Sequence, residues 1–126
     1  MKEVGAITCP REAAAYLGQH GHAVGTRGLM VLDANGTVLL EAGIAVSDPP
    51  REVLRLALRA GPTGSGMVAF VVEESVDLGV DLVIARALAL RLAGEAIGLP
   101  LLDFIVLGTD PGTGVYKSIR VLEGWA

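Results

Sequence analysis

The chain has 126 residues, a length typical of one domain, so we treat residues 1–126 as a single unit. Ten Lys and Arg against 14 Asp and Glu leave a formal net charge of −4, which argues against a phosphate-binding surface for nucleic acid. The single cysteine, Cys9, excludes an intramolecular disulfide. Together with the lack of a signal-peptide pattern, it predicts a cytoplasmic protein.

The chain is unusually apolar, since 52% of its residues are hydrophobic. The most apolar stretch, residues 82–102, is interrupted by Arg86, Arg91 and Glu95, so we predict no membrane span. In a small chain, excess apolar surface is typical of contacts between subunits. We therefore expect a homo-oligomer or another protein partner.

The first half of the chain predicts one helix and a hairpin. Residues 10–17 favour a helix, because a proline opens a run of good helix formers. The apolar run 29–32 predicts a buried strand, and residues 38–46 predict the strand that returns beside it. The Asn-Gly pair at 35–36 predicts a tight turn in which both residues take positive φ.

The second half predicts two helices and three strands. Apolar residues at helical spacing indicate a helix over 51–60, and 67–72 is typical of a buried strand. A long helix, from residue 78 or 80 to about 98, is apolar almost all the way round, so we expect it to be covered on most sides. Residues 101–107 and 115–122 predict the last two strands.

The predicted elements follow the order α-β-β-α-β-α-β-β. The hairpin makes the first two strands antiparallel, and a helical crossover between later strands makes a parallel pair possible. We therefore predict an α/β (α+β) fold with a mixed sheet flanked by helices.

Several local strings carry a family resemblance. The sharpest is Pro-Arg-Glu-Val at 50–53, and residues 7–17 and 101–108, with Tyr116 and Ser118, add to it. These strings resemble the RadC branch of the JAB/MPN (JAMM) family, in which Pro-Arg-Glu-Val/Ile opens the central helix. The resemblance spans nearly the whole chain and implies the JAB/MPN architecture, which is cytidine-deaminase-like.

The resemblance also implies a site, which this sequence lacks. In the family, two His of a His-x-His-Pro-Ser-Gly string and an Asp on the following helix bind zinc, and a Glu before the first strand moves the proton of the zinc-bound water. The matching positions here are Gly25 for the Glu, Val71 and Glu73 for the His, Ser75 for the Ser and Val83 for the Asp. Asp81 reaches the Asp position only if the helix register slips by two. Since Val cannot bind a metal and Gly cannot transfer a proton, we predict no catalytic residue, no metal and no cofactor.

An acidic cluster near these positions leaves one alternative open. Glu73, Glu74, Asp77 and Asp81 could form a carboxylate site for Mg²⁺ or Ca²⁺. The interpretation that we favour is a solvated turn with acidic residues near a helix N-terminus, where the helix dipole stabilises them.

Two residues are candidates for contacts with a partner. Arg86 lies on an apolar helix face, so it must either pair with a carboxylate or reach the edge of an interface. Trp125, near the C-terminus, is either loosely packed or an anchor for a partner.

The first functional hypothesis is a catalytically inactive RadC/JAB-like domain that acts as a protein-association or scaffold module. One alternative is a JAMM-type metal-dependent hydrolase or peptidase that uses the acidic cluster. A second alternative, nucleic-acid binding, is suggested only by the DNA-repair label of the family.

Overall fold

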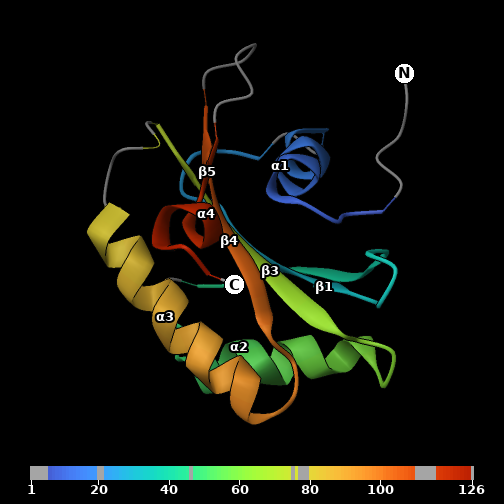
Figure 1. Cartoon of the computed structure of the whole chain (residues 1–126). Coiled ribbons are helices and arrows are strands. Elements are labelled where there is room, and N and C mark those ends of the chain that lie inside the picture. The colour runs from blue at the N-terminus through green and yellow to red at the C-terminus, as the bar shows by residue number, and fades with distance from the viewer. Residues whose placement is uncertain are drawn as a thin grey trace.

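A five-stranded mixed sheet forms the centre of the structure, with helices on both of its faces (Figure 1). The structure is a computed structural model, which describes residues 6–19, 22–45, 47–74, 76, 80–109 and 116–125. It confirms the predicted mixed sheet flanked by helices. The elements in chain order are α1 (Pro10–Gln19), β1 (Arg27–Leu32), β2 (Val38–Gly43), α2 (Pro50–Ala57), the 3₁₀ turn η1 (Leu58–Ala60), β3 (Gly66–Glu73), α3 (Val80–Ala96), β4 (Leu101–Gly108), β5 (Tyr116–Ser118) and α4 (Ile119–Glu123).

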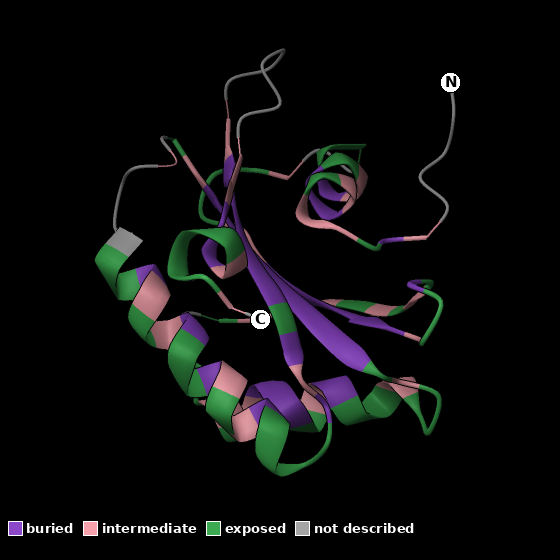
Figure 2. Ribbon diagram, viewed as in Figure 1, coloured by how far each residue is buried: buried purple, intermediate pink, exposed green. Residues whose placement is uncertain are grey.

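The strands lie in the order β2-β1-β3-β4-β5. β1 is antiparallel to both β2 and β3, and β5 is antiparallel to β4. β3 and β4 are parallel, so the chain must cross over between them, and α3 makes this crossover. β3 and β4 are buried along most of their length (Figure 2), as expected for inner strands covered on both faces.

Alternate residues of the strands build two separate cores, because successive side chains point to opposite faces of a sheet. We name the two sides the α2/α3 face and the α1 face, after the helices that cover them. The α2/α3 face carries Leu29, Val31, Met67, Ala69, Val71, Leu101, Phe104 and Val106. The α1 face carries Met30, Leu32, Val68, Phe70, Val72, Ile105 and Leu107.

The turn between β1 and β2 differs from the predicted tight turn. Gly36 has a φ of 84°, but no residue other than glycine has a positive φ among the described residues, so Asn35 does not adopt the predicted conformation. The carboxylate of Asp33 accepts hydrogen bonds from the backbone N–H groups of Asn35 and Thr37, at 2.8 and 3.0 Å. These bonds stabilise a wider connection, in which glycine alone supplies the positive φ. The second strand is also shorter than predicted, since β2 ends at Gly43.

The predicted last strand over 115–122 is wrong in its second half, which forms the helix α4. The buried carboxylate of Asp103 in β4 accepts hydrogen bonds from Ser118 Oγ at 2.6 Å and from the backbone N–H of Arg120 at 3.0 Å. Ser118 Oγ in turn accepts a bond from the backbone N–H of Val121, as a helix N-cap does. Two polar side chains that are distant in sequence therefore end the strand and start a helix.

Within the part of the chain that the structure describes, no helix is both long enough and apolar enough to span a bilayer.

Candidate functional site

The positions where the resemblance places a zinc ligand His and the ligand Asp are part of the apolar core. Val71, near the end of β3, is fully buried, and Val83, at the start of α3, is 4% exposed. Both belong to the cluster on the α2/α3 face, together with Ala87 and Phe104. Aliphatic side chains therefore occupy the two positions where the resemblance implies metal ligands, and they contribute packing to the core.

Gly25 and Glu73 lie together at the end of β3. The backbone N–H of Gly25 donates to the carbonyl of Val72 at 2.8 Å, which places Gly25 beside Glu73 where the middle strand of the sheet ends. Gly25 has a φ of 88°, a conformation that a glutamate would adopt only with strain. The backbone, as well as the missing carboxylate, thus disfavours the family's proton-transfer residue at this position. Ser75 lies outside the described residues.

The acidic cluster is not assembled into a metal site by the described residues. Glu73 is half-buried, whereas Glu74 and Asp81 are exposed. Asp77 lies outside the described residues. Across the described ranges, no three His, Cys, Asp or Glu residues are close enough together to hold a metal ion.

A pocket of about 140 Å³ opens on the α2/α3 face, between the segment after β2, the start of α2 and the middle of α3. Its walls are mainly apolar, and Ile44, Val53, Leu90 and Phe104 are among the residues that line it. Two cationic side chains also line it: Arg27 from the first position of β1 and Arg86 from α3. The described residues thus bring two positive charges to one mainly apolar cavity.

The two arginines of this pocket lack the partners that buried cations normally have. Nη1 of Arg86 is buried and has no hydrogen-bond partner among the described protein groups. Neither Arg86 nor Arg27 forms an ion pair with a described carboxylate. Burial and the nearby charge of Arg86 lower the pKa of Arg27, while the carboxylate of Glu73 opposes this shift. Of the two arrangements that the sequence predicts for Arg86, pairing with a carboxylate is not found within the described chain, and contact with the edge of an interface stays a prediction.

Arg27 was missed by the sequence analysis, although the sequence carried a signal for it. Leu29 and Val31 follow it at two-residue spacing, and the three side chains must share one face of a strand. What the spacing does not reveal is that α3 brings Arg86 over the same face.

Trp125 has contacts within the chain. It is half-buried and packs against the cluster on the α2/α3 face. The guanidinium of Arg91 lies over its ring, 4.6 Å from the ring centroid, and Arg91 also forms an ion pair with Glu95 at 3.5 Å. These contacts anchor the C-terminal segment to α3, and a role for Trp125 in binding a partner stays a prediction.

The outward face of α3 is apolar and exposed, which contradicts the expectation that the helix is covered on most sides. Leu82, Leu88 and Leu92 are 56%, 39% and 69% exposed. Ala85 and Ala89, which lie between them in the sequence, are also exposed. Figure 2 shows exposed segments along α3. Large apolar side chains in a continuous row on a helix are more typical of a contact surface than of a solvated face. We call the surface formed by these five residues the α3 face.

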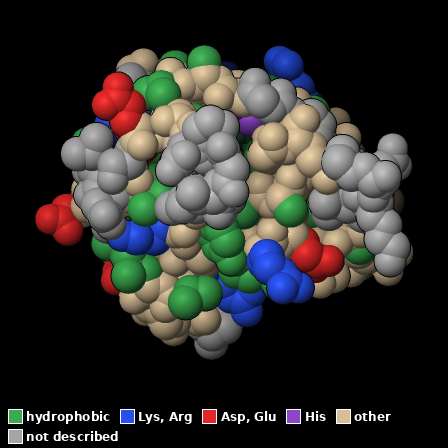
Figure 3. Space-filling view, turned by 90° about the horizontal axis from the view of Figure 1, so that it is seen from above, with side chains coloured by type: hydrophobic (Ala, Val, Ile, Leu, Met, Phe, Trp, Pro, Cys, Tyr) green, Lys and Arg blue, Asp and Glu red, His purple; other side chains and the backbone are tan. Residues whose placement is uncertain are grey.

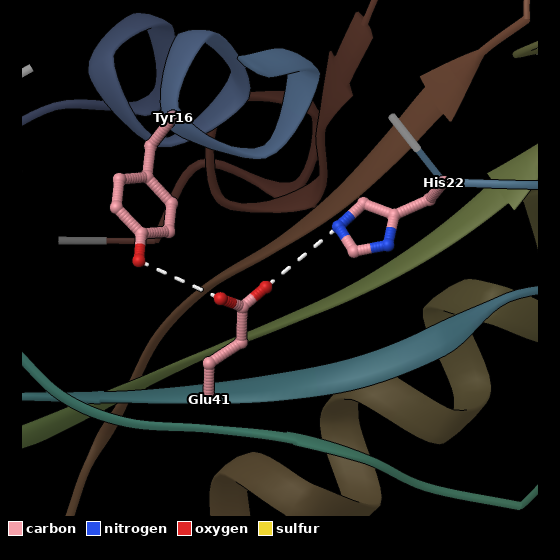
Figure 4. Close-up of polar contacts among 3 residues, drawn as sticks. All are labelled: Tyr16, His22 and Glu41. Atoms are coloured by element: carbon pink, nitrogen blue, oxygen red, sulfur yellow. Dashed lines mark hydrogen bonds and ion pairs between the residues drawn. The ribbon is translucent and has the colours of Figure 1, made fainter. Parts of the chain in front are cut away.

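A polar group on the other side of the sheet links α1 to the edge strand β2 (Figure 4). The hydroxyl of Tyr16 donates to Glu41 Oε2 at 3.5 Å, and His22 Nε2 lies 3.7 Å from Glu41 Oε1. Glu41 pairs with Met30, so the group lies on the α1 face, on the opposite side of the sheet from Val71. Burial and the charge of Glu41 raise the pKa of Tyr16, so its hydroxyl stays a proton donor. We interpret this group as a structural link.

The surface seen from above in Figure 3 carries hydrophobic side chains among both basic and acidic ones. This mixture differs from the basic stripe that a nucleic-acid-binding surface needs, and the net charge of −4 agrees with it.

Comparisons with known proteins do not assign the chain to a family. No family model matches it, and the comparison with curated proteins found no match. The resemblance to RadC-type JAB/MPN domains therefore remains a hypothesis, based on the sequence strings named above.

Proposed function

We propose that this chain is a RadC/JAB-like domain without metallohydrolase activity, and that it acts as a protein-association module by pairing with a second copy of itself through the α3 face. The observation on which the proposal rests is the row of exposed leucines Leu82, Leu88 and Leu92. This row leaves a large apolar surface in water on the longest helix of the described chain.

The loss of metal chemistry is supported by the packing at the family's ligand positions. Val71 and Val83 are buried in one apolar cluster, so a cation there would lose its hydration without gaining ligands. Gly25 has no side chain that could move a proton. Gly25, Val71 and Val83 therefore offer no group that could bind zinc or activate water as the family's residues do.

A second copy of the chain is the partner that suits the α3 face best. In a two-fold pair the same surface meets itself, so a good interface must not bring like charges together at its centre. The α3 face has only Leu and Ala at its centre, while Asp81 lies at its N-terminal end and Glu95 beside its C-terminal end. α3 has 17 residues and is about 25 Å long, which is long enough for two helices to pack along several turns.

The expected dimer is weak. Burying the exposed part of three leucines on each copy contributes about 1 kcal/mol per side chain, or about 6 kcal/mol for the pair. By itself this gain corresponds to a dissociation constant of about 40 µM, and association costs offset part of it, so we expect a dissociation constant of hundreds of micromolar. A reversible module of this kind assembles only where its local concentration is high.

Sedimentation equilibrium from about 10 µM to about 1 mM tests the proposal, because this range brackets the expected affinity. Leu92→Glu places a charge at the centre of the α3 face and is expected to weaken dimerisation by about tenfold or more. Leu58→Glu is the matched control, since Leu58 is 61% exposed but lies on η1. A wild-type chain that stays monomeric at about 1 mM contradicts the proposal. Equal weakening by both substitutions places the contact elsewhere.

Elemental analysis of the purified protein tests the other half of the proposal. We expect no stoichiometric metal and no change of the melting temperature after chelation. A tightly held zinc or other divalent ion whose removal lowers the melting temperature would favour the alternative, a hydrolase that uses an unusual carboxylate site.

A further inference from the structure

We propose that the pocket between α2 and α3 binds a short apolar monocarboxylate. The carboxylate pairs with Arg86 and Arg27, and a hydrocarbon tail of about three carbons fills the apolar part of the pocket. The pocket is formed by one chain, and it shares only Ala89 with the α3 face.

The charge of the ligand follows from the two arginines. Arg86 lines the pocket, and its Nη1 is buried without a protein acceptor among the described residues. A buried N–H group of a charged side chain raises the free energy of the protein when it has no acceptor. A ligand oxygen that reaches this N–H group therefore binds favourably. Arg27 lines the same pocket and lies close enough for the charge of Arg86 to lower its pKa. A carboxylate between the two would satisfy the first arginine and reduce the repulsion between them.

The size and polarity of the pocket define the rest of the ligand. Its volume of about 140 Å³ is close to that of an apolar cavity of about 150 Å³ that admits benzene, a molecule of six heavy atoms. Isobutyrate also has six heavy atoms, with two oxygens at one end. Ile44, Val53 and Leu90 offer apolar contacts to its methyl groups. Inorganic phosphate has no apolar part and would leave these walls without contacts, so a carboxylate with a hydrocarbon tail fits better.

One acidic residue lines the same pocket and gives the proposal a distinctive signature. Asp48 is exposed, and its Oδ2 accepts a hydrogen bond from the backbone N–H of Ala45 at 2.8 Å. Water screens this charge, but it still repels an anion in the pocket. Removing the charge should therefore tighten the binding of an anion and weaken the binding of a cation.

The test is a titration of the isotope-labelled full chain with isobutyrate, followed by the NMR shifts of its backbone amides. Isobutyramide is the control ligand, because it has nearly the same shape without the charge. We expect saturable shifts at the residues that line the pocket with isobutyrate, and at least tenfold weaker binding of isobutyramide. Since this comparison uses the wild-type chain, it does not depend on any variant folding.

Three variants locate the site. Arg86→Gln is expected to weaken isobutyrate binding by about tenfold or more, and Asp48→Asn to strengthen it about twofold to threefold. Arg59→Gln removes an exposed arginine of η1 and is expected to change nothing. Equal binding of the two ligands, equal effects of Arg86→Gln and Arg59→Gln, or no saturable shifts up to about 50 mM ligand, which corresponds to less than 2 kcal/mol of binding, would each overturn the proposal.

The carboxylate could belong to a free small molecule or to the C-terminus of a peptide. N-acetyl-leucine and a short peptide ending in leucine, each compared with its C-terminal amide, distinguish these sources. Tighter binding of the peptide than of isobutyrate indicates a chain terminus, and the reverse order indicates a free acid.

Discussion

Val83→Asp, which places the family's carboxylate at its expected position on α3, should lower the free energy of unfolding by about 4 kcal/mol or more. Val83 is 4% exposed and shares its apolar cluster with Val71, so the new charge would be buried without a partner. Urea denaturation at a protein concentration well below the dimer range measures the effect.

The neighbouring residue supplies the control for this prediction. Leu82 is 56% exposed, and Leu82→Asp in the monomer should cost about 0.5 kcal/mol or less. Added zinc should not restore the stability of Val83→Asp, because Val71 cannot provide a second ligand. If the two substitutions were equally costly, α3 would pack through a different side than the structure indicates.

Asp103→Ala is expected to have the second-largest effect, a loss of about 3 kcal/mol. The Asp103 carboxylate is 4% exposed and accepts hydrogen bonds from Phe104 N at 2.7 Å, Ser118 Oγ at 2.6 Å and Arg120 N at 3.0 Å. The substitution leaves these donors unpaired, one in β4 and two at the junction of β5 and α4. Ser118→Ala removes one of the donors and also the N-cap bond from Val121 N, so it should cost about 2 kcal/mol in the same denaturation measurement. A cost for Ser118→Ala larger than that for Asp103→Ala would contradict this prediction.

The same carboxyl group predicts a pH dependence of stability. Burial raises the pKa of Asp103 above its ordinary value, and the hydrogen bonds from Ser118, Arg120 and Phe104 oppose this shift only in part. The folded chain therefore binds more protons than the unfolded chain between the two pKa values. The stability that this group contributes is fully present below the unfolded pKa of about 3.9 and is lost as the pH rises through the folded pKa.

Asp103→Asn removes this titration and so provides the measurement. The difference in unfolding free energy between the wild type and Asp103→Asn should shrink as the pH rises from about 3.9 through the raised pKa. A difference that grows over this range would show that the pKa of Asp103 in the folded state lies below its ordinary value.

The sequence alone supported several statements that concern local patterns. Continuous apolar runs in β1 and β3 and helical spacing in α2 predicted these elements, because a strand covered on both faces is apolar throughout, whereas a helix covered on one side is apolar at every third or fourth residue. The absence of ligand chemistry at Gly25, Val71 and Val83 was also readable, since it depends only on residue type. The strand period could have placed Arg27 on the same face as Leu29.

Other features depended on contacts between residues that are distant in the sequence. Residues 119–122 read as a strand because they continue the apolar pattern of the residues before them, yet Asp103 in β4 starts a helix there by bonding to Ser118 and Arg120. The Asn-Gly turn widened because Asp33 accepts two backbone bonds. Propensity describes each residue by itself, and it carries no information about an acceptor supplied by another element.

The sequence by itself determined most of the strands and helices and the absence of ligand residues at Gly25, Val71 and Val83, because residue type and apolar pattern are local properties of the chain. Only the tertiary structure decided which side of the nearly all-apolar α3 packs on the sheet, since periodicity cannot orient a helix that is apolar on every side. That orientation leaves Leu92 in solvent, and it brings Arg86 to the pocket that Arg27 shares. Both proposals made for this protein follow from it.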